Sequence, residues 1–114
     1  MIARHPIIIR QGAYWSLPLT IREDGVLLPL ADYEIRMQVR PDVESEEVYL
    51  TLVSPQNIMI LDPGGVVPFL TAEETADLTT WTRGVYDIKF IPPDGRAEFY
   101  LEGPVDVQRS VTRS

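Results

Sequence analysis

Apolar and polar residues alternate with a period of two in several short runs of this chain, and turn-forming residues separate the runs. A strand that buries one face shows this alternation, because successive side chains point to opposite faces of a sheet. The pattern therefore predicts a small antiparallel β-domain. The clearest run sets one apolar-rich face against one polar face: Tyr33, Ile35, Met37 and Val39 against Glu34, Arg36, Gln38 and Arg40.

A second run covers residues 14–22, where Trp15 and every second residue after it are apolar. Pro18 lies within this run and has no amide hydrogen to donate, so the strand must be open on one side or locally broken there. The run ends at Glu23-Asp24-Gly25, which is typical of a hairpin turn. Further strands are expected at residues 26–30, 48–53, 57–61, 66–70 and 105–111.

The strongest hairpin signal is Pro92-Pro93-Asp94-Gly95, which separates the alternating runs 85–91 and 96–103. Inward side chains face inward side chains only if the loop has an even length. This condition predicts that Ile88 lies opposite Phe99 and that Lys89 lies opposite Glu98.

One helix is predicted, near residues 72–79. Thr71 and Glu74 have the spacing of a capping box, in which each side chain accepts a hydrogen bond from a free amide of the first turn. Threonines and Gly84 follow and end the helix within about two turns. Leu78 and Trp81 are expected to cover one end of the core.

These elements fit into one domain, residues 1–114. About eight or nine strands and one short helix bury one face of each strand most economically as two packed sheets. The predicted fold is therefore an all-β, immunoglobulin-like two-sheet sandwich.

Charge limits the partners. The net charge is −7 and lysine occurs once, so the chain has too few basic residues in excess to form the cationic face that nucleic acids require. No apolar stretch approaches the length of a membrane span, so no membrane partner is expected. The acidic segment 41–47 lacks the glycine of a calcium loop, and no metal or cofactor is expected.

Residues suited to catalysis are few. The single histidine, His5, lies near the start of the chain, and Asp87 and Glu98 are carboxylates on a predicted solvated face. We therefore expect no enzyme activity. Tyr14, Tyr49 and Tyr100 are the aromatic residues whose position in the alternation is outward or ambiguous, which leaves a sugar-binding platform as an alternative.

Candidate interface residues lie near both ends of the chain. Ile7-Ile8-Ile9 is a β-branched run that either closes the chain's own sandwich or adds to the sheet edge of a neighbour. The basic residues that flank it have no acid near them in the sequence, and the end of the chain shows a similar pattern. The full set of interface candidates is Arg4, Ile7, Ile9, Arg10, Arg109 and Arg113.

Several short sequence segments, taken in order over nearly the whole chain, resemble those of one protein family. The segments are Ile9-Arg10-Gln11-Gly12, Glu23-Asp24-Gly25, Pro29-Leu30, the run 33–40, Leu70-Thr71-Ala72-Glu73-Glu74-Thr75, Val85-Tyr86-Asp87-Ile88, Pro93-Asp94-Gly95, Leu101-Glu102-Gly103 and Val111-Thr112-Arg113. They resemble small β-sandwich structural proteins of tailed bacteriophages, and are similar to the N-terminal domain of phage baseplate upper proteins.

The resemblance implies a non-catalytic virion part, assembled in the cytoplasm of the bacterial host. It would join tail, baseplate or tail-fibre components through its sandwich edges and termini, with other virion proteins and further copies of itself as partners. A capsid cement or decoration protein is the alternative within the virion. A carbohydrate-binding module is the alternative outside that class.

Overall fold

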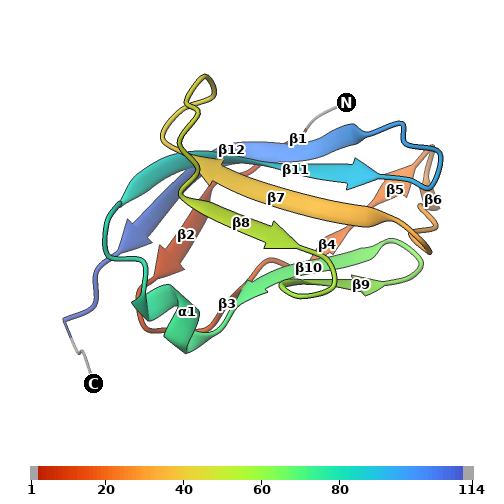
Figure 1. The fold of residues 1–114 in the computed structure, drawn as a ribbon. Coiled ribbons are helices and arrows are strands. Elements are labelled where there is room, and N and C mark those ends of the chain that lie inside the picture. The colour runs from red at the N-terminus through yellow and green to blue at the C-terminus, as the bar shows by residue number, and fades with distance from the viewer. Residues whose placement is uncertain (1–2, 112–114) are drawn as a thin grey trace.

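The computed structural model describes residues 3–111, and its strands form the predicted immunoglobulin-like sandwich (Figure 1). The larger sheet has six strands, in which β8, β7, β11 and β12 lie side by side and β1 and β2 both pair with β12. Its strands are β1 (Ala3–Arg4), β2 (Ile7–Arg10), β7 (Glu34–Arg40), β8 (Leu50–Val53), β11 (Arg83–Ile91) and β12 (Glu98–Gln108).

The smaller sheet has four strands, with β10 at its centre. A separate hairpin, β5 (Arg22–Glu23) and β6 (Val26–Leu27), turns at Asp24 and Gly25, which both have positive φ, as a tight two-residue turn requires. The strands of the smaller sheet are β3 (Trp15–Ser16), β4 (Leu19–Thr20), β9 (Ile58–Leu61) and β10 (Gly65–Leu70).

Pro18 interrupts one edge of this sheet without changing the register. Trp15 lies opposite Leu70 and Leu19 lies opposite Val66, so β3 and β4 continue the same ladder on β10. Because β9 occupies the other side of β10, the interrupted strand is an edge strand. The expected open side and local break are both confirmed.

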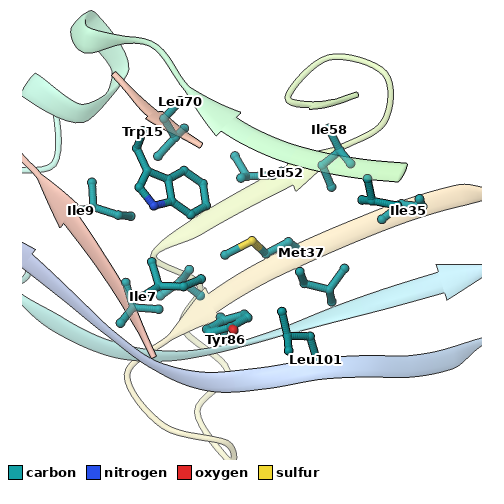
Figure 2. Packing of buried hydrophobic residues seen from close by; sticks show 14 of the residues in the cluster. Ile7, Ile9, Trp15, Ile35, Met37, Leu52, Ile58, Leu70, Tyr86 and Leu101 are labelled. Atoms are coloured by element: carbon teal, nitrogen blue, oxygen red, sulfur yellow. The ribbon is translucent and has the colours of Figure 1, made fainter. Parts of the chain in front are cut away.

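The core fills the space between the two sheets (Figure 2). The side chains predicted to point inward from β7 are almost completely buried, and the indole of Trp15 enters the core from the other sheet. The most deeply buried large side chains are Phe90, Ile9, Leu30, Ile35, Met37, Leu52, Ile58, Leu70 and Ile88.

The capping box predicted at residues 71–74 begins helix α1 (Ala72–Ala76). The Thr71 amide donates to Glu74 Oε1 at 2.9 Å, and the Glu74 amide donates to Thr71 Oγ1 at 3.1 Å. The hydrogen bond from Thr71 lowers the pKa of Glu74, because it favours the charged carboxylate. The helix ends at Ala76 rather than at 79, and Leu78 and Trp81 are buried as expected.

The predicted pairing in the last hairpin is wrong. Ile88 lies opposite Leu101 rather than Phe99, and Lys89 lies opposite Phe99 rather than Glu98. The register changes between Ile88 and Lys89, so β12 contains a bulge.

The bulge has a packing cause. Tyr100 is the extra residue on β12, and its ring packs edge-to-face on Phe90, with ring centroids 4.9 Å apart. Phe99 then points outward and is 41% exposed. In addition, the two strands expected at residues 96–103 and 105–111 form one strand, β12, which passes through Pro104.

The N-terminal segment pairs within the chain. β1 and β2 both run parallel to β12, and the connection between them crosses Gly103. The His5 amide donates to Glu102 O at 2.9 Å, and Tyr86 Oη donates to His5 O at 2.7 Å. A Cβ atom on Gly103 would lie 2.2 Å from His5 O, so this crossing requires glycine.

Candidate interaction surfaces

The isoleucines among the predicted interface residues lie inside the sandwich. Ile7 and Ile9 point inward from β2 and are 3% and 0% exposed, so their side chains are core residues and form no outer surface. Ile8, between them, points outward and is 58% exposed. The face of β2 that reaches solvent is therefore the one that carries Ile8, which is not among the predicted interface residues.

The two N-terminal arginines remain on the surface. Arg4 forms an ion pair with Glu102, with 3.6 Å between Nη1 and Oε2, because β1 and β12 place them side by side. Arg10 Nη2 donates to Gln108 Oε1 at 3.3 Å. Their contacts with a partner chain stay a prediction, and Arg113 lies outside the described residues.

Arg109 has a role within the fold. Its guanidinium donates to the carbonyl of Leu78, to Thr79 O at 2.9 Å and to Trp81 O at 3.5 Å. These carbonyls belong to the irregular segment between α1 and β11, which has no ladder to satisfy them. Arg109 therefore holds this segment against the end of β12.

The outer face of the larger sheet is hollowed. A hollow of about 520 Å³ opens there, between β7, β11, β12 and β1 and under the acidic loop 41–47. Arg40 holds the base of the loop, because its guanidinium donates to Ser45 O at 2.6 Å and to Gln38 Oε1 at 2.9 Å. The charged side chains that line the hollow are Arg4, Arg36, Arg40, Lys89, Asp42, Asp87 and Glu102.

Strand register places the charges of the hollow in rows. Gln38, Asp87, Glu102 and Arg4 are successive neighbours across four strands. Asp87 and Glu102 are thus two carboxylates directly opposite each other, an unfavourable cross-strand pair. Partial burial raises the pKa of Asp87, and Glu102 raises it further, while nearby cations offset part of this effect. The hollow presents a carboxylate pair enclosed by positive charge.

The outer face of the smaller sheet has the opposite chemistry. Met59 lies opposite Val67, and Leu61 lies opposite Gly65, so β9 and β10 place apolar groups side by side. Tyr14 stacks on Phe69 at the other end, with ring centroids 6.3 Å apart. We call this surface the apolar face; its outward side chains are Tyr14, Ser16, Pro18, Thr20, Met59, Leu61, Val67 and Phe69.

Only one of the three predicted outward tyrosines is strongly exposed. Tyr49 stacks on Trp81, with ring centroids 4.8 Å apart and planes within 6°, and Tyr100 packs on Phe90. Burial and the hydrogen bond that its hydroxyl donates to Glu98 raise the pKa of Tyr100. Tyr14 is 61% exposed. The three rings therefore do not form a common platform.

The residues considered for catalysis are not brought together as a pair. Glu98 accepts a hydrogen bond from Tyr100, and Asp87 lies opposite Glu102. His5 contributes its backbone to the crossing over Gly103. Within residues 3–111, no three His, Asp or Glu side chains gather as metal ligands. No helix in the same range has the length and apolarity to span a membrane.

No protein-family model matches the chain, and no curated protein matches it. Among solved structures, a similar one is described as parallel homodimers of the extracellular domains of the voltage-gated sodium channel β4 subunit, which explain its role in cell–cell adhesion. The sequences are 12% identical, the match covers 95% of this chain and 93% of that chain, and the TM-score is 0.51. At this identity the likeness shows the fold, an immunoglobulin-like sandwich.

Of the sequence-based interface residues that the structure describes, Arg4 lines the hollow and none belongs to the apolar face. The apolar face has a local signal, because Met59 and Leu61 occupy outward positions where alternation calls for polar residues. The hollow has no such local sequence signal, because its charged residues come from four strands and one loop that are distant in sequence.

Proposed function

We propose that this chain is a non-catalytic structural adaptor of a bacteriophage virion that joins tail, baseplate or tail-fibre components. The observation that carries the proposal is the order of the short sequence segments between Ile9 and Arg113. In this order the segments resemble small β-sandwich proteins of tailed phages. The proposed partners are other virion proteins and further copies of this chain. Its proposed location is the phage particle, assembled in the host cytoplasm.

The geometry supports an adaptor, because an adaptor must contact two different partners. The sandwich carries two outer faces of unlike chemistry: the charged hollow on the larger sheet and the apolar face on the smaller one. The hollow offers both cations and carboxylates. It therefore favours a partner whose own charges are placed opposite these groups. The apolar face favours a partner that excludes water.

The proposal also includes the N-terminal edge of the larger sheet as a contact site. Arg4 and Arg10 are on the surface beside β12, and exposed Ile8 lies between them in sequence. This strip is the outer edge of the larger sheet, where a neighbouring strand could be added. Ile7 and Ile9 would then stabilise the edge from the inside.

A capsid cement protein would use the same surfaces against head subunits, so it is the second candidate. A carbohydrate-binding module would need several exposed aromatic rings on one surface. Tyr14 stacks on Phe69, whereas the exposed ring of Phe99 lies on the larger sheet. Two rings 6.3 Å apart offer a small platform for sugar stacking.

Disruption of the gene in a phage or prophage that encodes the chain tests the proposal. A stop codon should yield full heads with missing or defective tails or fibres, and supply of the intact chain from a plasmid should restore them. Tails that assemble normally beside unstable heads would instead support the cement protein. Particles that never contain the chain, and that form normally without it, would contradict both virion roles.

A further inference from the structure

We propose that the apolar face is the contact between two copies of this chain, packed face to face about a two-fold axis. The inference depends on the surface of the smaller sheet and not on a role in the virion. Met59 and Leu61 on β9 are 45% and 55% exposed, which is unusual for outward positions on a strand that faces water, and Tyr14, just before β3, is 61% exposed. Such a surface marks a contact site.

Charge points to a second copy as the occupant. Each chain carries a net charge of −7, so two copies repel unless their contact excludes ionised groups. The outward side chains of β3, β4, β9 and β10 include none, whereas the outer face of the larger sheet carries at least seven. A cationic partner would be better served by a face with carboxylates. The uncharged face is the one on which two equally acidic chains can meet.

The distribution of side chains suits a two-fold contact. The aromatic pair of Tyr14 and Phe69 lies toward one end of the face, and Met59 and Leu61 lie toward the other. Val67 lies on the central strand β10, directly opposite Met59 and two residues from Phe69. An isologous contact centred near Val67 would place the rings of one copy over the thioether and aliphatic chains of the other. Sulfur–aromatic contacts of this kind are favourable.

The size of the face sets the expected strength. Three strand positions about 4.8 Å apart and about seven residues of about 3.4 Å each cover roughly 340 Å² in projection. A standard stable interface buries about 800 Å² per partner. The dimer should therefore be weak in dilute solution and should dominate where copies are held close together.

Sedimentation equilibrium of the full chain from micromolar to near-millimolar concentration tests the inference. We expect a monomer–dimer equilibrium that stays unchanged or strengthens when NaCl is raised from low to high concentration. Salt screens the repulsion between two acidic chains and does not weaken apolar contacts. A contact made by terminal arginines and carboxylates would instead weaken with salt.

Matched variants locate the contact. Leu61→Glu adds a charge to the apolar face, and Ile8→Glu adds the same charge at a side chain of nearly equal exposure, 58% against 55%, on the larger sheet. Leu61→Glu should raise the dimer Kd at least about tenfold, and Ile8→Glu should leave it within about twofold of the starting value. Thr20→Glu adds a charge without removing apolar surface, so it serves if Leu61→Glu disturbs folding.

Three results would overturn the inference. The first is a chain that remains monomeric at every concentration. The second is a dimer that weakens as salt rises. The third is a dimer that Leu61→Glu and Thr20→Glu leave intact, or that Ile8→Glu weakens equally.

Discussion

Replacement of Gly103 by alanine tests how the N-terminal segment is held on the sandwich. The added Cβ would lie 2.2 Å from His5 O and 2.9 Å from His5 C, which are both backbone atoms. Ordinary contacts are more than 3 Å long, so His5 must move away by about 1 Å. Neither atom belongs to a flexible side chain that can turn aside.

The cost follows from the contacts that this movement breaks. The His5 amide loses its bond to Glu102 O, which is worth about 0.5–1.5 kcal/mol. The Tyr86 hydroxyl loses His5 O, and a buried hydroxyl left without a partner costs about 1–3 kcal/mol. Burial of Tyr86, which raises its pKa to about 12, makes water a poor substitute. Gly103→Ala should therefore lower the free energy of unfolding by about 2–4 kcal/mol.

Thermal and urea denaturation measure this loss, and Tm should fall by about 8–16 °C for a domain of this size. Tyr86→Phe provides a double-mutant cycle. It should cost about 1 kcal/mol in the original chain and should be stabilising beside Gly103→Ala, because there it removes a buried hydroxyl that has already lost its partner. The reasoning is refuted if Gly103→Ala melts within about 1 °C of the original chain, or if Tyr86→Phe costs the same in both backgrounds.

Three further predictions concern single contacts. Arg109→Ala should lower stability by about 1–3 kcal/mol in urea denaturation, because the carbonyls of Thr79 and Trp81 lose their Arg109 donor and that of Leu78 keeps only the Gln11 amide; an unchanged midpoint would contradict this. Asp87→Asn should raise the free energy of unfolding at pH 7 slightly, by less than about 1 kcal/mol, since the ionised carboxylate is disfavoured by partial burial and by Glu102. The raised pKa means that this gain disappears as pH falls below the ordinary range of an aspartate, and a gain that persists in acid would count against it. Thr71→Ala should cost about 1 kcal/mol, and the difference should shrink as acid protonates Glu74, whose lowered pKa reflects the same cap; pH-dependent melting curves of both proteins measure it.

Local patterns in the sequence were sufficient for most of the sandwich. Alternation identified the buried residues of β7, Asp24-Gly25 identified a tight turn, and the spacing of Thr71 and Glu74 identified the start of α1. Each of these features depends on residues within a few positions of one another. The fold class followed from their number and order.

Features that depend on distant contacts were not predictable in the same way. The bulge in β12 exists because Tyr100 packs on Phe90, and alternation alone cannot specify that contact. The crossing of the N-terminal segment depends on Gly103, almost a hundred residues further along the chain. Arg109 was predicted as an interface residue, yet its hydrogen bonds reach carbonyls 28 to 31 residues away within the fold.

The two candidate surfaces also differ in whether they depend on neighbouring residues or on distant contacts. The outward apolar residues of β9 can be read in the sequence as exceptions to alternation, although their neighbours on β10 and β3 cannot. The hollow arises only when four strands take their register. Among the interface residues predicted from the sequence, and within the described part of the chain, Arg4 alone lines one of the two candidate surfaces.

Amine-reactive cross-linking and mass spectrometry of gradient-purified phage particles test the adaptor role most directly. Lys89 is the single lysine of the chain, and it lies in the hollow of the larger sheet. A cross-link from Lys89 therefore reports which polypeptide occupies that surface. The adaptor role predicts cross-links from Lys89 to a tail, baseplate or tail-fibre component. Particles without the chain, or cross-links from Lys89 to head proteins alone, would contradict it.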